Sequence, residues 1–357
     1  MKGIKALSLA LSLALLLGVT ACSPKESTSS SGAGQSASNS TAGASSAEQS
    51  GDPADGVKQP EGYPSKAINW IIPVAAGAAV DLPTRALIDV LDLGEPVVAE
   101  NIAGANQTLG TAEAAARDAD GYTLLTMANA CGITQPIMGG LAYTLDDFRF
   151  IAMLAPSVQA TICVKADSKL QNAQDFVDYV QNNEYTFGVP NAGGYGHIAI
   201  ATTLDQLGAY DNGTMMVYSG SNENITAILN GEVEFAIVDD TDAISRVESG
   251  ELRVLAILHD EQSRLFPDAD LISDYGVEDI STFIGLKWIA IRADTPTEIV
   301  DWLKQELNAA IQSEEYQQYL ETMGFGPVRE YTEEELDELI ATAAEDYKVV
   351  MEKVGLI

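Results

Sequence analysis

The chain has 357 residues, of which 52 are acidic and 19 are lysine or arginine, so its formal net charge at pH 7 is −33. A surface with this charge repels nucleic acid and anionic lipid, and we exclude nucleic acid as a partner. The histidines, His197 and His259, are too few for a multi-histidine zinc site, and we expect neither a metal nor a cofactor. Cys131 and Cys163 form no CxxC pair, which favours buried free thiols over a disulfide.

Residues 1–21 have the pattern of a processing signal. Lys2 and Lys5 precede an apolar run, residues 6–19, that is too short to cross a bilayer as a helix. The run ends in Val-Thr-Ala-Cys, which resembles a bacterial lipobox. The resemblance implies cleavage before Cys22 and attachment of lipid to this cysteine. The alternative is an ordinary secretory signal in which the cysteine is incidental.

The tract from Cys22 to residue 62 is rich in serine, glycine and alanine and has almost no large apolar residue. Such a segment buries too little surface to offset chain entropy, and we predict a disordered linker. Its composition resembles the linkers of Gram-positive lipoproteins. We therefore expect the folded body to be held by the lipid on Cys22 at the outer face of the cell membrane.

From Ile68 onward, apolar strands alternate with amphipathic helices, which is typical of an α/β protein with mainly parallel sheets. Toward the C-terminus, capping-box spacing predicts two further helix starts, at Thr295 and at Thr332. The predicted strands are 68–74, 96–100, 122–128, 150–154, 161–165, 185–189, 214–218, 235–238, 254–258 and 283–290. The predicted helices before residue 295 are 82–91, 106–117, 172–181, 196–207, 223–230 and 242–249.

Two crossings of the chain are expected to divide this body. A polar turn, residues 166–168, follows one strand, and the return is expected near residues 291–295. We predict one lobe from residues 63–165 plus 291–357 and a second lobe from residues 166–290. The ligand cleft is expected between the two lobes.

Small, polar, glycine-rich loops follow four of the predicted strands, at residues 75–81, 128–134, 190–197 and 218–222. Ligands of open α/β sheets bind at the carboxyl ends of strands, where all of these loops lie. The first loop leads into a helix, whose unpaired N–H groups and partial positive charge suit an anion. From these loops we select the candidate ligand-binding residues Ala76, Gly77, Ala78, Ala79, Val80, Asp81, Asn129, Asn191, Gly193, Gly194, Tyr195, Gly196, His197, Tyr218, Ser219, Gly220 and Ser221.

Several of these residues also have a purely structural interpretation. Asp81 can cap the helix that follows it, and Arg85 can pair with an acid of this acidic chain. Asn129 can close a turn instead of donating its amide to a ligand, and His197 can orient its own loop. Tyr195 and Tyr218 can stack on a ligand or pack where the lobes meet.

A pair of acids follows the strand 235–238 directly. Asp239 and Asp240 can bind a cation or an ammonium group, or they can cap the next helix. The capping interpretation is favoured.

A series of short motifs runs along residues 63–357 in a distinctive order. They are Tyr63-Pro64, Pro73 with Ala75-Ala76-Gly77, Asp81 with Arg85, Glu100-Asn101, Gly104-Ala105, Asp120–Leu125, Gly193–His197 and Tyr218 with Gly220. The series resembles the substrate-binding proteins of tripartite tricarboxylate transporters, the Bug family. The resemblance implies a two-lobe, periplasmic-binding-protein-like (type II) α/β fold with a central ligand cleft and no catalysis. It also implies a small-molecule carboxylate ligand, held by backbone amides of the first and third loops and passed to membrane permease subunits.

The chain departs from the family pattern at two places. Ala78 and Ala79 stand where the family usually has glycine, so a left-handed backbone at either position would be strained. Ser219 stands where the family commonly has lysine, which removes a cation from the expected cleft. Carboxylate binding through backbone donors remains the expectation, while the identity of the ligand is left open.

These observations favour an extracytoplasmic solute-binding lipoprotein. One alternative is a secreted hydrolase that uses carboxylates of the cleft, although no GxSxG or HExxH motif occurs. Another alternative is a ligand-sensing partner of a membrane sensor kinase, which would use the same cleft.

Overall fold

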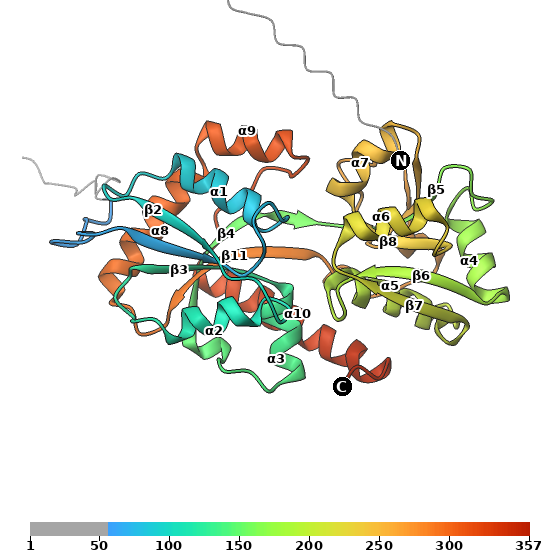
Figure 1. Cartoon of the computed structure of the whole chain (residues 1–357), viewed down its shortest axis with the longest axis horizontal. Coiled ribbons are helices and arrows are strands. Elements are labelled where there is room, and N and C mark those ends of the chain that lie inside the picture. The colour runs from blue at the N-terminus through green and yellow to red at the C-terminus, as the bar shows by residue number, and fades with distance from the viewer. Residues whose placement is uncertain (1–55) are drawn as a thin grey trace, which may run out of the picture. The chain divides into compact units, whose positions relative to one another are not determined.

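The computed structural model describes residues 56–357, in which the chain forms two β-sheets (Figure 1). The predicted signal peptide, Cys22 and most of the predicted linker lie outside the described residues. The first sheet has the order β2(Val97–Asn101), β1(Ile68–Ile72), β3(Thr123–Ala128), β11(Gly285–Arg292), β4(Phe148–Val158). The second sheet has the order β10(Asp270–Leu271), β9(Leu252–Ile257), β5(Ala160–Lys165), β8(Phe235–Asp239), β6(Tyr185–Pro190), β7(Gly213–Tyr218).

Helices cover both sheets, and we call each sheet with its packed helices a lobe. On the first sheet, α1 and α9 lie on one side and α2, α3 and α10 on the other (Figure 1). On the second sheet, α6 and α7 pack together, and α5 packs against β5, β6 and β8. The helices are α1(Asp81–Val90), α2(Thr108–Ala116), α3(Gln135–Met138), α4(Ala173–Asn182), α5(Tyr195–Gln206), α6(Ser221–Asn230), α7(Asp240–Glu248), α8(Thr297–Ile311), α9(Glu314–Thr322) and α10(Glu333–Lys353).

The central strands are apolar on both faces because helices cover both faces. Every residue of β3 is buried. Along β5 the side chains alternate, since Cys163 joins the apolar cluster under α6 and α7 while Ile162 and Val164 join the larger cluster. Cys131 and Cys163 are buried free thiols, as predicted, and burial raises the pKa of Cys163 to about 12.

All ten predicted strands are confirmed, with ends that differ by a few residues. The sequence missed the two-residue strand β10, the helix α9, and the helical turns at Ala130–Thr134 and α3 in the second loop. The capping box predicted at Thr332 is present, because its hydroxyl accepts from the Glu335 N–H at 3.1 Å. The box predicted at Thr295 is wrong: α8 begins at Thr297 with no side-chain cap, and the Thr295 hydroxyl is buried without a partner among the described residues.

Strand pairing differs from the predicted lobe boundaries at two strands. The boundaries at 165/166 and 290/291 place β5 in the first lobe and most of β11 in the second, whereas β5 pairs with β8 and β9 and β11 pairs with β3 and β4. The polar turn at 166–168 therefore lies inside the second lobe. Gln159 alone separates β4, in the first sheet, from β5, in the second.

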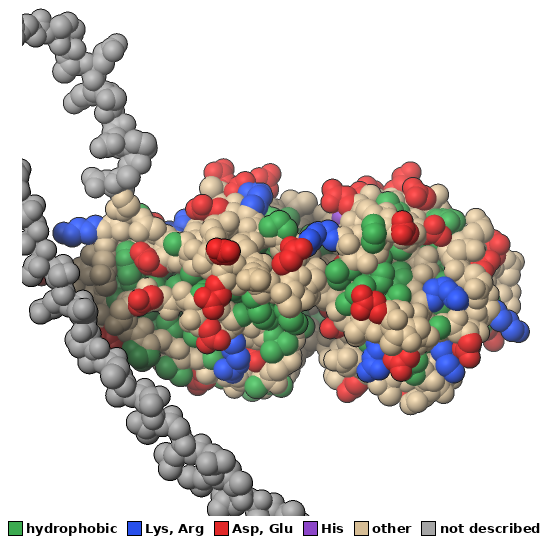
Figure 2. Space-filling model, turned by 90° about the horizontal axis from the view of Figure 1, so that it is seen from above, with side chains coloured by type: hydrophobic (Ala, Val, Ile, Leu, Met, Phe, Trp, Pro, Cys, Tyr) green, Lys and Arg blue, Asp and Glu red, His purple; other side chains and the backbone are tan. Residues whose placement is uncertain are grey.

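No helix within residues 56–357 is long and apolar enough to span a membrane. Within the same range, no three His, Cys, Asp or Glu side chains gather closely enough to hold a metal ion. Figure 2 shows acidic side chains spread over the displayed face of both lobes, in keeping with the net charge of −33.

Candidate functional site

The side chain of Asp81 holds the first loop, residues 75–80, in place through a hydrogen bond. The Asp81 carboxylate is 1% exposed and accepts the Gly77 N–H at 2.7 Å. Arg85 Nε donates to both of its oxygens at 2.9 Å, and Asn101 Nδ2 donates to Oδ1 at 2.8 Å. Burial alone would raise the pKa of Asp81, but the hydrogen bonds from Arg85, Gly77 and Asn101 hold it below its ordinary value. Asp81 therefore stays charged near neutral pH.

This network corrects two expectations. Asp81 does not cap α1, because Val80 is the N-cap residue and no side chain caps that end. The Gly77 N–H is taken by Asp81, so it is not free to bind a ligand. The structural interpretation of Arg85 is confirmed by its pairing with Asp81.

Four backbone donors of the first loop have no partner among the described residues: the N–H groups of Ala75, Ala76, Ala79 and Val80. Those of Ala79 and Val80 lie at the N-terminus of α1. Only Gly77 in this loop has a positive φ, of 82°, so Ala78 and Ala79 carry none of the strain that their side chains would bring to a left-handed backbone. Donors at a helix N-terminus suit a carboxylate.

The second loop is helical from its start, and Asn129 fastens it to the rest of the first lobe. Its amide Nδ2 donates to the Ile284 carbonyl and to the Tyr347 hydroxyl, each at 3.0 Å. Its Oδ1 accepts the Leu286 N–H at 2.7 Å. Both side-chain N–H donors are used within the protein, so Asn129 has a structural role here and neither closes a turn nor offers a free donor.

The third loop is shaped by His197, which is fully buried in α5. Its Nδ1 accepts the Gly193 N–H at 2.9 Å, and burial lowers its pKa to about 4. The neutral ring therefore orients the loop, as the structural interpretation expects, while Asn191 and Gly193 take left-handed φ values of 59° and 75°. Gly194 is the N-cap residue of α5.

The third loop meets the first lobe. A Cβ built on Gly193 would lie 3.6 Å from Cβ of Thr134, in the second loop. Asn106 Nδ2 donates to the Ala192 carbonyl at 3.5 Å. The structure thus brings the second and third loops together across the seam between the lobes.

The fourth loop lies beside the third. The Asn191 N–H donates to the Tyr218 carbonyl at 2.9 Å, at the end of β7. Ser219 is exposed, and its N–H donates to Glu223 at 3.0 Å. The Ser221 hydroxyl accepts the Asp239 N–H at 3.2 Å, which joins this loop to the end of β8. Tyr218 has a buried hydroxyl with no partner in the described chain.

Tyr195 packs at the seam and donates its hydroxyl to Asp239. A Cβ built on Gly285, at the start of β11, would lie 2.9 Å from the Tyr195 ring. Burial first, and then the neighbouring Asp242 charge, raise the pKa of Asp239 to about 7. Asp239 is also the N-cap residue of α7, although its side chain makes no capping bond.

Sequence reasoning missed two features of this region. Ala105, Asn106 and Gln107 take consecutive left-handed φ values of 46°, 53° and 74° just before α2, and no glycine marks these positions. Lys287 is buried on β11, and burial lowers its pKa although the charges of Asp239, Asp242 and Asp240 act in the opposite direction. The available signal was a single charge inside the otherwise apolar strand GLKWIAI.

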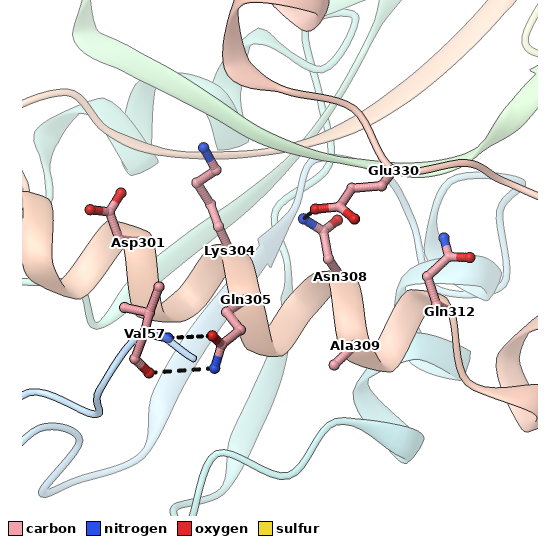
Figure 3. Close-up of a pocket in the computed structure, with 8 residues that line it drawn as sticks. All are labelled: Val57, Asp301, Lys304, Gln305, Asn308, Ala309, Gln312 and Glu330. Carbon is pink, nitrogen blue, oxygen red and sulfur yellow. Dashed lines mark hydrogen bonds between the residues drawn. The ribbon is translucent and has the colours of Figure 1, made fainter. Parts of the chain in front are cut away.

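Two hollows of the described chain have walls that contain none of the candidate loops. One of about 480 Å³ lies along α8 under Val57, whose N–H donates to Gln305 (Figure 3). Another, of about 400 Å³, lies at the seam between residues 156–159, 259–264 and 324–327. Neither is lined by a candidate ligand-binding residue.

Comparison with known proteins identifies the class. Residues 86–356 match the sequence profile described as "Tripartite tricarboxylate transporter family receptor", and the chain belongs to this family. The chain is 28% identical over 275 residues to Protein BugT of Bordetella pertussis, and the aligned residues cover 74% of this chain and 82% of BugT. The resemblance predicted from the motifs is therefore confirmed.

Solved structures show the same fold. MatC (Rpa3494) from Rhodopseudomonas palustris with bound malate superposes with a TM-score of 0.70 at 19% identity, over 81% of this chain and 99% of MatC. R. palustris Rpa4515 with adipate superposes with a TM-score of 0.72 at 21% identity, over 82% of this chain and 98% of that protein. These likenesses confirm the predicted two-lobe α/β fold of periplasmic solute-binding proteins.

Proposed function

We propose that the chain is an extracytoplasmic solute-binding lipoprotein that captures a small carboxylate-bearing metabolite between its lobes. The observation that carries the proposal is membership of the tricarboxylate receptor family over residues 86–356. The malate held by MatC and the adipate held by Rpa4515 support a carboxylate as the ligand class.

The first lobe would bind the carboxylate through the unpaired N–H groups of Ala79 and Val80. The second lobe would contribute the third and fourth loops, which begin α5 and α6. Residues 76, 78–80, 191–196 and 218–221 remain the proposed ligand contacts. Gly77, Asp81, Asn129 and His197 are assigned to structure because their polar groups are bonded within the protein.

Delivery to a tripartite tricarboxylate-type permease and anchoring through lipid on Cys22 belong to the same proposal. The receptor family supports the first, and the lipobox-like sequence supports the second. The proposal assigns no catalysis. In support, both histidines have structural partners: His197 accepts from Gly193, and His259 Nε2 lies 3.0 Å from the Ser281 carbonyl.

A thermal-shift screen of the purified protein against malate, adipate, citrate and uncharged analogues tests the proposal. A ligand at one hundred times its dissociation constant stabilises the protein by about 2.7 kcal/mol, which is several degrees. Ala79→Asp places a negative charge at the free donors of the first loop and should abolish the shift. Ala309→Asp, an exposed position on α8 of the same lobe, should leave it unchanged. A screen in which no carboxylate stabilises the protein would contradict the proposal.

A further inference from the structure

Arg264 and Leu265 of the second lobe reach across the seam to residues 324–326 of the first lobe, and we call this contact the clasp. The Arg264 guanidinium donates from Nη1 to the Phe325 carbonyl at 2.8 Å and from Nη2 to Glu321 Oε1 at 3.1 Å. The Arg264 and Glu321 side chains are 51% and 65% exposed, so water screens their ion pair. The bond to the backbone carbonyl is therefore the stronger part of the clasp.

Two glycines let the lobes approach this closely. A Cβ built on Gly326 would lie 3.1 Å from Arg264 Nη1, and one built on Gly324 would lie 3.0 Å from Leu265 Cδ1. Phe325, between them, is buried and belongs to the larger apolar cluster. The carbonyl that receives Arg264 is thus held in place by the buried side chain of its own residue.

Within the second lobe, the clasp is connected to the third loop. The Ser263 hydroxyl is buried, donates to Asp240 at 2.9 Å and accepts the Leu265 N–H at 3.2 Å. Asp240 follows Asp239, which accepts the Tyr195 hydroxyl from the third loop. The residues on either side of Arg264 are therefore fixed to the strand end that also holds the third loop.

Within the first lobe, the clasp is connected to the first loop through α9, which ends at Thr322. This helix packs against α1, the helix that follows the first loop. The hydroxyl of the buried Tyr316 on α9 donates to the Leu154 carbonyl at 2.8 Å and lies 3.2 Å from the Pro83 carbonyl in α1. The two sides of the clasp thus belong to the parts of the lobes that carry the first and third loops.

The clasp bridges a part of the seam that side chains leave open. The hollow of about 400 Å³ is lined by residues 156–159, where the chain crosses between the lobes, and by Arg264 and residues 324–326. Gln159 alone connects β4 to β5 there. A crossing of one residue beside an open hollow lets one lobe turn relative to the other, and the clasp resists that turn.

We propose that the clasp positions the first and third loops relative to each other, so that Arg264 raises ligand affinity without touching the ligand. A ligand held from both lobes binds only the arrangement in which both loops reach it. If the clasp is lost, this arrangement becomes a smaller fraction of the population, and the apparent dissociation constant rises in inverse proportion to that fraction. The effect on affinity rests on the proposed function, whereas the effect on the lobes does not.

Distances between spin labels test the effect on the lobes in the ligand-free protein. Ala116→Cys on α2 and Asp178→Cys on α4 place the labels at exposed positions of the first and second lobes. Pulsed electron paramagnetic resonance should give a narrow distance distribution with the clasp intact and a broader one in Arg264→Ala. Arg246→Ala is the matched control and should leave the distribution unchanged, because Arg246 pairs with Glu251 inside the second lobe at 2.7 Å.

A second variant breaks the clasp from the first lobe. Gly326→Ala places a Cβ against the Arg264 guanidinium, at a position whose φ is not positive, so the backbone itself accepts alanine. This variant should broaden the distance distribution as Arg264→Ala does.

Calorimetry with malate, adipate and citrate measures the effect on affinity. Arg264→Ala and Gly326→Ala should bind the acid that the wild type binds about fivefold more weakly or worse, and Arg246→Ala should bind it as the wild type does. The proposal is overturned if the two clasp variants keep the wild-type distance distribution, or if they broaden it and affinity stays the same. If none of the acids binds the wild type, the proposed function fails, while the label distances still decide whether the clasp positions the lobes.

Discussion

Asp81 and Asp239 both lie at a helix start, one in each lobe: Asp81 is the first residue of α1, and Asp239 is the N-cap residue of α7. Asp81 has an arginine at 2.9 Å and two further donors, and its pKa is lowered. Asp239 has no cation within 4.0 Å in the described chain and a second acid nearby, and its pKa is raised to about 7. At neutral pH Asp81 is therefore charged, whereas Asp239 is partly protonated.

The difference extends to the rest of the seam. In the first lobe, Asp81 is fully paired, and backbone N–H groups of the first loop are left free. In the second lobe, Asp239 and Asp242 are partly buried, and neither makes an ion pair within 4.0 Å in the described chain. The acid beside the first loop is therefore paired without a ligand, whereas the acids after the second-lobe strand are not.

The largest expected effect comes from removing the closed network. Asp81→Ala leaves Arg85, Asn101 and the Gly77 N–H without their shared acceptor, and should lower the free energy of unfolding by about 3 kcal/mol. Because the folded pKa is lowered, this stability is present above the ordinary value of 3.8 and is lost as pH falls through the folded pKa. Urea denaturation measures it, with the exposed Asp89→Ala on the same helix as the control. If both variants lose the same small amount of free energy of unfolding, the hydrogen bonds of Asp81 do not stabilise the protein as expected.

Asp239→Asn is expected to raise the free energy of unfolding at high pH instead of lowering it. The folded carboxyl keeps its proton up to about pH 7, whereas the unfolded one loses it near 3.8, so wild-type stability falls as pH rises between these values. Asparagine removes this slope while its side-chain oxygen can still accept from Tyr195. At pH 8 the variant should be about 2 kcal/mol more stable than wild type, and at pH 4 about equal. If the free energies of unfolding of variant and wild type differ by the same amount at every pH, the pKa of the Asp239 carboxyl is not raised on folding.

Part of the fold and of the candidate site could be predicted from the sequence. Strands follow from local patterns, so β1, β3 and β6 were placed correctly, although the segment after β3 is helical where a loop was predicted. The hydrogen-bond partners of Asn129 could not be predicted, because Ile284, Leu286 and Tyr347 lie 155 to 218 residues away and no local pattern reports them. Lys287 was missed for a related reason: strand propensity says nothing about which acids of another lobe a side chain faces.

A smaller effect tests the hydrogen bonds around Asn129. Tyr347→Phe removes the hydroxyl to which Asn129 donates, with little change in shape, and should cost about 1 kcal/mol of stability. Tyr319→Phe is the matched control, since the Tyr319 hydroxyl makes no hydrogen bond among the described residues. If the two variants are equally stable, the Asn129 bonds contribute less than their geometry suggests.

The smallest effect is expected for the exposed ion pair between the lobes. Lys353, on α10 of the first lobe, pairs with Asp205, on α5 of the second, with side chains 58% and 26% exposed. Lys353→Met should change the free energy of unfolding by no more than about 0.5 kcal/mol, because solvent and salt screen such a pair. Lys348→Met, at an exposed position of the same helix, controls for the loss of one positive charge. A loss above about 1 kcal/mol that vanishes in high salt would mean that this pair holds the lobes together. In that case electrostatics would act between the lobes at their surface as well as at Asp81 and Asp239.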